Sequence, residues 1–303
     1  MKIVIAGGSG FLGGRLVDSF LQNAHAVTVI SRKPQNIKVQ LAGSEIVSWN
    51  DLEKNTSGNI LSDTDVVINL AGESIGDKRW TKEQKSNLLS SRIDPTDKLV
   101  EWVNNSTARP AKFINASAVG YYGNSGGEVL NESSLAGDDF LAEICVAWEK
   151  HAARLDQSHT KLILLRIGVV LDPQEGALQK MVLPFKFFAG GKLGSGDQWI
   201  SWIHIDDLVA IFNFLINMHE IAGIVNATAP NPVTNSRLTK AIANTLNRPA
   251  LFPVPAFALK LLLGEQSLLV LNGQRVMPEN LLQAGFSFNF PEIDAALDDL
   301  YHK

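Results

Sequence analysis

The chain has 303 residues, of which 45% are hydrophobic and 19% are charged, and its formal net charge is -4. This length can bury a large core, as one big α/β unit or as two smaller ones, and it excludes a peptide-sized binding module. The ordinary globular composition and the slightly acidic balance provide no basic surface, so nucleic acid is not an expected partner.

The cysteine content indicates the cellular compartment, and the apolar runs indicate whether the chain could span a membrane. Cys145 is the single cysteine, which excludes an internal disulfide framework and favours a reducing compartment. No signal peptide precedes the first predicted strand, so we expect a cytoplasmic protein. Residues 251–271 are apolar, but Pro, Lys, Gly and Glu interrupt them before they reach the roughly 18 residues of a membrane span. We expect this stretch to be core, with no membrane partner.

The N-terminal segment 2–13 combines a short β-branched strand, a glycine cluster and the start of an amphipathic helix. Glycines let a backbone approach a pyrophosphate closely, and a helix start offers unpaired N–H groups and the positive end of the helix dipole. The G-x-x-G-x-x-G spacing differs from the standard G-x-G-x-x-G, and glycine-rich turns also serve plain chain reversal. The position between strand and helix favours a dinucleotide phosphate site, formed by Gly7, Gly10, Phe11, Leu12 and Gly13.

The second predicted strand, residues 27–30, ends at the position where a dinucleotide-binding fold selects its cofactor. An acidic residue there binds the ribose 2′-OH of NAD, whereas an arginine accommodates the 2′-phosphate of NADP. The alternative is a solvated basic turn made by Arg32 and Lys33. The diagnostic position favours NADP(H) as the cofactor, with Ser31 and Arg32 among its binding residues.

A further predicted strand at 65–70 runs into small residues that would let a ligand approach the backbone. In a doubly wound sheet this strand end lies beside the glycine turn, at the carboxyl edge where ligands collect. Leu70 and Ala71 are therefore expected cofactor neighbours, and a simple tight turn is the alternative. An amphipathic helix is predicted at 81–104, where Asn87 and Arg92 interrupt the apolar pattern and could reach the cofactor.

Four motifs follow one another along the chain: GGSGFLG, VINLAG, SAVGYYG and WIHIDDL. In this order they resemble the extended branch of the short-chain dehydrogenase/reductase superfamily, to which nucleotide-sugar epimerases and dehydratases belong. The segments KRWT, LRIGVVL, GSGDQWISWIHIDD and GQRVMP are similar, more narrowly, to the atypical "epimerase family protein" group of NAD(P)-dependent epimerase/dehydratase-like proteins.

The resemblance implies an α/β fold, namely a Rossmann-type doubly wound parallel sheet with a smaller C-terminal α/β substrate region. We expect an NADP(H)-binding domain over about residues 1–170, with segments at about 200–230 returning to it. Residues 171–303 would form mainly the substrate region, and the piece from about residue 254 is typical of the group.

The resemblance also implies a partial catalytic set. In the extended branch a Ser or Thr hydrogen-bonds the reacting carbonyl or hydroxyl, and Ser117 matches it if one residue is inserted before the Tyr-Gly pair. The branch then uses a Tyr as acid/base and a Lys four residues later as a fixed charge. Alignment through Glu149 places Leu141 and Cys145 at those two positions. Neither side chain can perform that chemistry, so the usual dyad is absent.

The turn after Ser117 offers other candidates. Tyr121 or Tyr122 could supply a phenol, or the pair could pack beneath the loop; we take Tyr121, with Ser117, as the catalytic candidates. Cys145 lies among apolar residues without a cationic neighbour in sequence, which is typical of a buried, inert cysteine. In the extended branch the next strand ends over the nicotinamide, so Arg166 is a further expected cofactor contact.

The segment 190–207 resembles the substrate-binding loop of the extended branch. The arginine that clamps the substrate diphosphate in that branch is replaced by Ile200, and an aliphatic side chain cannot donate bidentate hydrogen bonds. This replacement counts against a nucleotide-sugar substrate. Trp199 and Trp202 suggest a flatter, more apolar substrate wall, with core packing as the alternative.

His204 and Arg275 are two further residues for which the sequence gives an expectation. In the family that the chain resembles, the His-Ile-Asp-Asp run from His204 closes a strand and caps a helix from Asp206, so a structural role is favoured for His204 and a catalytic role is the alternative. Arg275 could face the substrate cleft, and the histidines lack metal-ligand spacing, so no metal is predicted.

The favoured function is an oxidoreductase or epimerase-like enzyme that moves a hydride between NADP(H) and a small carbonyl or alcohol, with Ser117 polarising the oxygen. The alternative is an NADP(H)-dependent regulatory or binding protein. A small-molecule substrate is the expected partner, and no oligomeric state is predicted.

Overall fold

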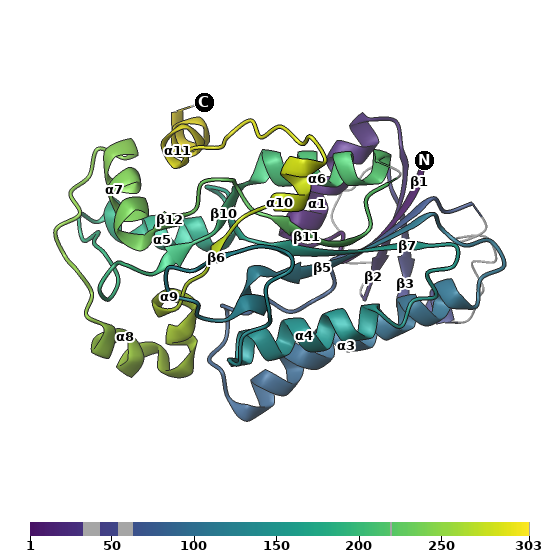
Figure 1. The fold of residues 1–303 in the computed structure, drawn as a ribbon, viewed down its shortest axis with the longest axis horizontal. Coiled ribbons are helices and arrows are strands. Elements are labelled where there is room, and N and C mark those ends of the chain that lie inside the picture. The colour runs from purple at the N-terminus through teal and green to yellow at the C-terminus, as the bar shows by residue number, and fades with distance from the viewer. Residues whose placement is uncertain (33–42, 54–62, 219, 303) are drawn as a thin grey trace.

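A parallel β-sheet occupies the centre of the molecule in the computed structural model, which describes residues 1–32, 43–53, 63–218 and 220–302 (Figure 1). Among these residues seven strands form the sheet in the order β11-β7-β5-β4-β1-β2-β3, and each neighbouring pair is parallel. The strands are β1 (Lys2–Ala6), β2 (Ala26–Ser31), β3 (Glu45–Ser48), β4 (Val66–Asn69), β5 (Lys112–Ala118), β7 (Lys161–Ile167) and β11 (Gly223–Ala227).

The strand order reverses between β1 and β4. From β1 the chain moves outward through β2 and β3, and then it returns to the other side of β1 at β4. In open α/β sheets ligands bind beyond the carboxyl ends of the strands at such a reversal point. The predicted doubly wound parallel sheet is confirmed, and its reversal point is the place where β1 meets the glycine turn.

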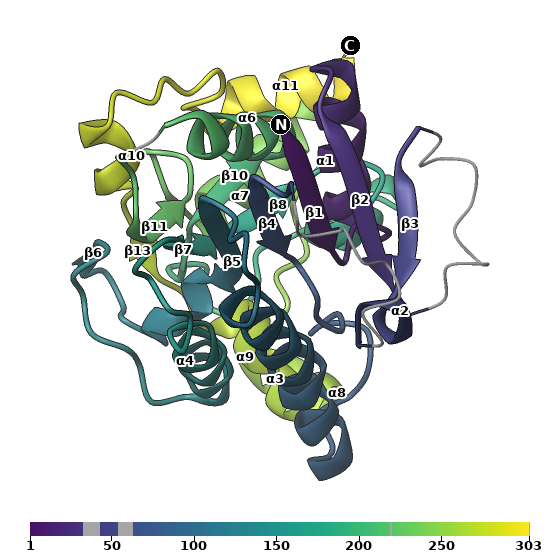
Figure 2. The ribbon, with the colours of Figure 1, turned by 90° about the vertical axis from the view of Figure 1, so that its right-hand side faces the viewer.

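Helices cover both faces of the sheet (Figure 2). One face carries α1 (Phe11–Gln22) and α6 (Ile205–Asn217), and the other carries α3 (Lys82–Asn104) and α4 (Phe140–Ala152). A short helix, α2 (Trp49–Glu53), follows β3. The predicted helix at 81–104 corresponds to α3, whose N-cap is Thr81. Because β11 is the edge strand of the sheet and α6 packs on one of its faces, residues 205–227 belong to this layer; they lie within the segments at about 200–230 that were expected to return to it.

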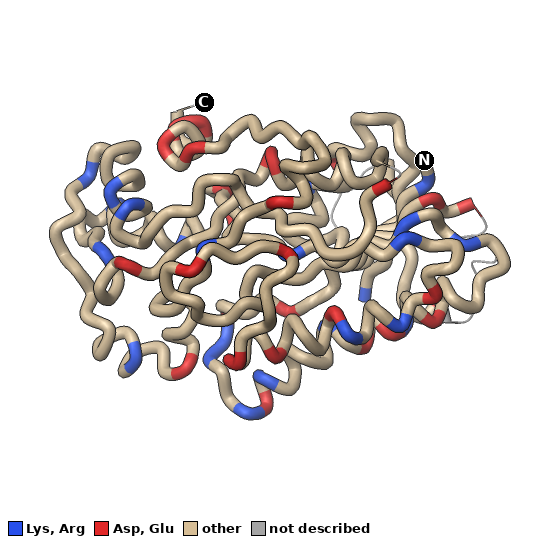
Figure 3. Tube along the Cα trace, in the orientation of Figure 1, with Lys and Arg blue, Asp and Glu red and all other residues tan. Residues whose placement is uncertain are grey.

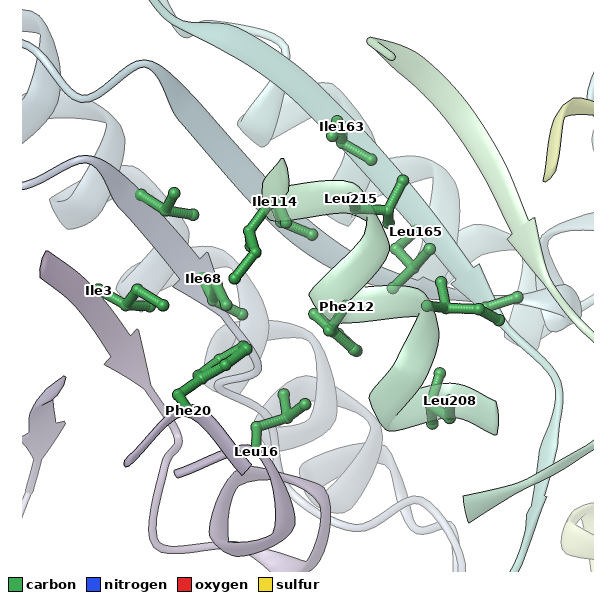
Figure 4. Close-up of a cluster of buried hydrophobic side chains, with 14 of the residues drawn as sticks. Ile3, Leu16, Phe20, Ile68, Ile114, Ile163, Leu165, Leu208, Phe212 and Leu215 are labelled. Atoms are coloured by element: carbon green, nitrogen blue, oxygen red, sulfur yellow. The ribbon is translucent and has the colours of Figure 1, made fainter. Parts of the chain in front are cut away.

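The side chains of the buried strands alternate between two cores, as the period of two in a strand requires. Ile3 and Ile5 face α1 and α6, whereas Val4 between them faces α3, and all three are fully buried. Figure 4 shows the first of these cores, in which Phe20 of α1 and Phe212 of α6 meet the strand residues. A strand buried on both faces needs apolar side chains in succession, which explains the unbroken β-branched run at the N-terminus.

A second, smaller part is built from short strand pairs and helices. The pairs are β8 (Val169–Leu171) with β10 (Trp202–His204), β9 (Trp199–Ile200) with β12 (Val233–Thr234), and β6 (Val129–Leu130) with β13 (Arg275–Val276). The helices of this part and its connections are α5 (Gly176–Lys186), α7 (Asn235–Thr245), α8 (Ala256–Leu263), α9 (Leu268–Leu271), α10 (Glu279–Gln283), α11 (Ile293–His302) and the 3-10 helices η3 (Val119–Tyr122) and η4 (Gly264–Ser267). Its own core includes Trp202, which is fully buried.

The expectation that residues 251–271 are core is wrong for most of the large apolar side chains there. Helix α8 turns only Leu259 inward, because it lies at the edge of the molecule against η4. The side chains left exposed are Leu251, Phe252, Phe257, Leu261 and Leu262. None of the helices in the described ranges is long and apolar enough to cross a membrane. Basic and acidic residues are mixed along α3, whereas acidic residues gather on α11 (Figure 3).

Lys112 ties the amino end of β5 to the last turn of α6. Its side chain is buried, and its ammonium donates to the carbonyl oxygens of Leu215 at 2.6 Å, Ile216 at 3.0 Å and Met218 at 2.7 Å. These carbonyls end a helix, where they lack intrahelical partners and where a positive charge is favourable. The buried cation therefore completes the hydrogen bonds of α6.

Replacing Lys112 with Met should lower the free energy of unfolding by about 1–3 kcal/mol, because buried carbonyl groups lose their donor. Equilibrium urea unfolding measures this change. Lys240→Met, at an exposed position on α7, should leave the midpoint within error. An unchanged midpoint for Lys112→Met would contradict the capping role.

Candidate functional site

The glycine turn between β1 and α1 is pressed against the end of β4. Gly7 has φ +81, and a Cβ atom on it would lie 2.8 Å from the carbonyl carbon and oxygen of Leu70. A Cβ atom on Gly13 would lie 2.3 Å from the carbonyl oxygen of Gly7, so α1 also packs directly on the turn. Only glycine fits such close backbone contacts. The turn and the Leu70–Ala71 segment, both predicted for the cofactor, thus lie together at the reversal point of the sheet.

The first turn of α1 is suited to an anion. Gly10 is the N-cap and supplies no side-chain cap, and the first turn contains no acidic residue. The first N–H groups of a helix have no intrahelical acceptor, so they and the helix dipole favour a negative group in front of them. Phe11 and Leu12, which carry two of these N–H groups, are half-buried at the helix start.

The end of β2 brings a positive charge to the same edge. Ser31 is buried and Arg32 is exposed, while Lys33 lies outside the described residues. The pKa of Glu73, which follows β4, is lowered mainly by the hydrogen bond from Lys78 and in smaller part by the charge of Arg32. Arg32 is therefore close enough to the turn after β4 to affect a carboxylate there, although β2 and β4 lie on opposite sides of β1.

Arg92 of α3 fastens the segment after β4 to the helix. Its Nη2 donates to the carbonyl oxygen of Glu73 at 2.9 Å and its Nη1 to that of Leu88 at 2.9 Å, while its guanidinium lies 5.3 Å from the ring of Trp148. Burial lowers the pKa of Arg92. Asn87, one turn earlier on the helix, is exposed. Of these two predicted cofactor contacts, Arg92 lies at the edge beside Gly72.

The 3-10 helix η3, which carries Tyr121 and Tyr122, forms the tyrosine turn. The positions that carry Tyr and Lys in the extended branch lie on α4 beside this turn. A Cβ atom on Gly120 would lie 3.3 Å from Cβ of Leu141 and 3.8 Å from Sγ of Cys145. Cys145 is buried, as expected, and desolvation raises the pKa of its thiol to about 11. A thiol that stays protonated at neutral pH is a poor nucleophile. The two positions therefore contribute apolar packing.

A buried polar network connects β5, α4, β7, the tyrosine turn and β11. Arg166 and Glu149 form a bidentate pair, with Nε to Oε1 and Nη2 to Oε2 both at 2.8 Å. The hydroxyl of Ser117 donates to Glu149 Oε1 at 2.6 Å. On the other side, Arg166 Nη1 donates to the hydroxyl of Tyr122 at 3.0 Å, and this hydroxyl donates to Oδ1 of Asn226 at 2.8 Å.

The pKa shifts of Arg166 and Tyr122 agree with the hydrogen bonds of this network. Burial lowers the pKa of Arg166, but the hydrogen bonds and the charge of Glu149 outweigh it and hold the pKa above its usual range. Burial raises the pKa of Tyr122 despite the opposing charge of Arg166, so this phenol stays protonated at neutral pH. Arg166 is 1% exposed and Ser117 4% exposed. Their direct contacts with cofactor and substrate stay predictions; the bonds that they make serve the network.

Tyr121 differs from its neighbour Tyr122. Its ring stacks on the guanidinium of Arg166 at 3.3 Å and meets the ring of Tyr122 edge-on at 5.4 Å. The side chain is half-buried, and within the described part of the chain its hydroxyl makes no hydrogen bond. Tyr122 is thus engaged in the network, whereas Tyr121 presents an oriented and unengaged phenol.

Sequence reasoning missed Glu149 and Asn226 as members of the site. Both left a signal, because each places a polar side chain where its element is otherwise apolar. Glu149 continues the buried face of α4 that includes Cys145 and Trp148, and Asn226 interrupts the apolar strand β11. A buried polar side chain needs partners, so each position was a candidate for a network.

His204 caps α6, as expected. Its Nδ1 accepts from the backbone N–H of Asp206 at 3.1 Å, and its ring stacks on Phe290 with the ring centres 4.0 Å apart. Ligand atoms of His204, Asp206 and Asp299 lie within 4.8 Å of one another, but the cap already uses Nδ1. This cluster therefore has a structural explanation.

A cavity of about 660 Å³ lies at the amino ends of β4 and β5, lined by Thr64, Asp65, Ser106, Thr107, Arg109, Ala111 and His159. Parallel strands place their amino and carboxyl ends on opposite edges of the sheet. The cavity is therefore on the edge away from the glycine turn, and it is not a part of the nucleotide-binding edge.

Comparisons with known proteins agree with this geometry. The sequence profile of the NAD dependent epimerase/dehydratase family matches residues 3–227, and that of a domain of unknown function (DUF1731) matches residues 254–300, where the C-terminal piece was predicted. The chain is 40% identical over 299 residues to "Epimerase family protein SDR39U1 homolog, chloroplastic" of Arabidopsis thaliana, covering 98% of this chain and 86% of the relative. It is 38% identical over 301 residues to epimerase family protein YfhF of Bacillus subtilis, covering 99% and 98%.

A solved structure is similar over the whole chain. The crystal structure of human epimerase family protein SDR39U1 (isoform 2) with NADPH superposes with a TM-score of 0.91 at 33% identity, covering 100% of this chain and 99% of the human chain. The glycine turn at the reversal point of the sheet, the family profile and these relatives lead to one assignment. The chain belongs to the NAD dependent epimerase/dehydratase family, in its group of epimerase family proteins.

Proposed function

We propose that the protein binds NADP(H) at the glycine turn and is an oxidoreductase or epimerase-like enzyme for a small carbonyl compound or alcohol. The observation that carries the proposal is the close backbone contact of Gly7 with Leu70 at the reversal point of the sheet. It leaves the uncapped first turn of α1 facing the edge where a pyrophosphate would be held. The crystal structure of human SDR39U1, a relative of this chain, contains NADPH, which supports the choice of cofactor.

Arg32 supports NADP(H) over NAD(H). It is an exposed cation directly after β2, at the position where dinucleotide-binding folds distinguish the ribose 2′-OH from a 2′-phosphate. Charge-assisted hydrogen bonds to a phosphate are roughly twice as strong as neutral ones. The residues that would hold the cofactor are those of the glycine turn, Ser31 and Arg32 at the end of β2, and Leu70, Ala71 and Arg92.

The bound nicotinamide supplies or accepts the hydride; the chain must supply the proton. Tyr121 is the proposed proton donor and acceptor, because its phenol is oriented by Arg166 and makes no hydrogen bond within the described residues. Leu141 and Cys145 cannot replace it, since leucine has no ionisable proton and the thiol of Cys145 is buried among apolar side chains. Ser117 stays a candidate for the substrate oxygen, to which its hydroxyl would have to turn from Glu149.

The buried network is the proposed support of this turn. Arg166, paired with Glu149, donates to the hydroxyl of Tyr122 and stacks on the ring of Tyr121. Asn226 accepts from the hydroxyl of Tyr122, so both tyrosines are held in position. Catalytic groups need such positioning, because a small misplacement costs much of the rate. Ile200 in place of an arginine argues that the substrate is not a typical nucleotide sugar.

The alternative function is an NADP(H)-dependent regulatory or binding protein. The observation that favours it is the apolar packing at Leu141 and Cys145, where the family chemistry would need an acid/base and a cation. Incubation with NADPH and a panel of aldehydes, ketones and oxo acids separates the two. NADPH oxidation that depends on Tyr121 or Ser117 supports the enzyme, and its absence on every compound supports the regulatory function.

The proposal also includes the cellular compartment and the binding partners of the protein. A cytoplasmic protein with a small-molecule substrate, and without nucleic acid or membrane partners, is proposed from composition and charge. The Arabidopsis relative is named as chloroplastic.

Arg32→Ala should weaken NADPH binding by an amount on the order of 1.5–3 kcal/mol, the worth of a hydrogen bond to a charged group, and should leave NADH binding nearly unchanged. Titration calorimetry with both cofactors measures the two affinities. Arg154→Ala, just after the C-terminal end of α4, is the control that should change neither. Equal affinities of the parent protein for NADPH and NADH would refute the role of Arg32.

Tyr121→Phe should reduce NADPH-dependent turnover by about 10²–10⁴-fold, the usual contribution of a general acid, with an unchanged dissociation constant for NADPH. The assay is NADPH oxidation at 340 nm on the best compound of the panel. Tyr301→Phe removes the hydroxyl of a half-buried tyrosine on α11 and should retain parent turnover. Parent turnover in Tyr121→Phe would exclude this phenol as the proton donor.

Glu149→Gln should lower the free energy of unfolding by about 3–5 kcal/mol, because Arg166 would remain buried without its counter-charge. Replacing both partners, as Glu149→Leu with Arg166→Met, should be less destabilising than the single change. Chemical denaturation of the three proteins gives the comparison. A double variant less stable than Glu149→Gln would show that the pair itself contributes net stability.

A further inference from the structure

Arg275 has a buried N–H donor that makes no hydrogen bond within the described residues. It is the first residue of β13, and its guanidinium lies 4.4 Å from the ring centre of Trp199 in β9. Its Nε is shielded from solvent, and no acceptor or carboxylate within the described residues pairs with it. A stacked guanidinium keeps its N–H groups in the plane parallel to the ring, where they are available to a ligand.

Ser125 carries a second donor of the same kind on the neighbouring loop. Its Oγ is buried and has no hydrogen-bond partner in the part of the chain that is described. The backbone N–H of Ser125 donates to the carbonyl oxygen of Gly273 at 3.3 Å, and the N–H of Gly273 donates to Oδ1 of Asn124 at 3.2 Å. The loop of Ser125 is thus bound to the segment that leads into Arg275.

Trp199 joins both segments. A Cβ atom on Gly273 would lie 2.2 Å from the carbonyl oxygen of Trp199, and one on Gly127 would lie 3.7 Å from its indole Nε1. The loop at 124–127, the strand β9 and the start of β13 therefore meet at one place. Two buried polar groups without partners at one such place are unusual, since buried polar groups in proteins are nearly always hydrogen-bonded.

This place adjoins the tyrosine turn. Val276, which follows Arg275 and points to the other side of β13, packs with Val119 and Tyr122 in one buried cluster. The hydroxyl of Ser201 accepts from the N–H of Val276 at 2.8 Å and donates to the carbonyl oxygen of Gln274 at 2.8 Å, which fixes β13 beside the segment of Trp199. The backbone of β13 is thereby held beside the tyrosine turn, and the side chain of Arg275 lies on the face of the strand that meets Trp199.

We propose that Arg275 and Ser125 bind the carboxylate of the substrate, so that the substrate class is a carbonyl compound bearing a carboxylate, or the corresponding hydroxy acid. The inference rests on the proposed function and adds to it the substrate class. One fork of N–H donors with a single positive charge, together with one hydroxyl, matches the two planar oxygens and the single charge of a carboxylate. Trp199 holds the guanidinium in orientation.

The reaction on such a substrate balances with the groups already named. With NADPH bound, the carbonyl carbon would receive a hydride with its electron pair, which leaves NADP⁺, and the carbonyl oxygen would receive the phenol proton of Tyr121, which the tyrosinate would regain from water. The product is a hydroxy acid, and the carboxylate bound by Arg275 is unchanged.

The test measures ligand binding to the full chain saturated with NADP⁺, in which an oxo acid binds without being reduced. Three matched pairs of acid and methyl ester serve as probes: phenylglyoxylate, 2-oxobutyrate and 4-oxopentanoate with their esters. At least one acid should bind tenfold or more tightly than its ester. Arg275→Gln should weaken binding of that acid at least tenfold and leave the affinities for its ester and for NADP⁺ within twofold.

Two further variants keep the test decisive. Arg275→Lys retains the charge but loses the fork and the planar stacking on Trp199, so it should bind the acid with an affinity between those of the parent and Arg275→Gln. Arg248→Gln is the matched control: Arg248 is exposed and stacks on Phe188 at 4.6 Å, away from the tyrosine turn, and its loss should change nothing.

The outcomes separate this inference from the proposed function. Absence of NADP⁺ binding by the parent counts against the proposed function. NADP⁺ binding without preference for the acid in any pair, or a preference that survives Arg275→Gln, overturns the Arg275 site alone. Displacement of the bound acid by inorganic phosphate at lower concentration than by acetate overturns the carboxylate class.

Discussion

Glu149 and Arg166 form a bidentate ion pair at the carboxyl end of the sheet, and their side chains are 8% and 1% exposed. Removing two charges from water is costly, and their attraction compensates only when the geometry is good and the remaining donors and acceptors are satisfied. Here Ser117 donates to the carboxylate and the hydroxyl of Tyr122 accepts from the guanidinium. The pair therefore depends on β5, β7, α4 and η3 together, and it defines how these elements meet.

The cofactor edge depends on a different constraint, the close approach of backbones. Gly7 contacts the end of β4 and Gly13 contacts the turn itself, at distances that a side chain would block. This contact brings the start of α1, the end of β2 and the segment after β4 to one edge. The glycine turn itself depends on these backbone contacts, and Arg92 holds the segment after β4 beside it by hydrogen bonds to Leu88 and Glu73.

The catalytic Tyr and Lys positions of the extended branch hold other residues in this chain. Leu141 and Cys145 pack against Gly120. Arg166 of the buried network lies against the ring of Tyr121 in the tyrosine turn. The same turn continues into the loop that contacts Trp199 and Gly273. A single short segment thus connects the buried ion pair, the unengaged phenol and the place where Arg275 lies.

The order of the motifs in the sequence indicated the doubly wound sheet through a family resemblance. The sequence by itself also determined the glycine turn between the first strand and the first helix, and the helix of 81–104. These follow from local periodicity and from glycines between a strand and a helix, which neighbours in sequence decide. Only the tertiary structure decided that Ser117 and Arg166 meet Glu149, that Tyr122 is engaged while Tyr121 is not, and that Arg275 stacks on Trp199. It also left α8 largely exposed where an apolar run predicted core. Partners 32, 44 or 76 residues apart in sequence cannot be identified from spacing, because the packing of separate elements selects them.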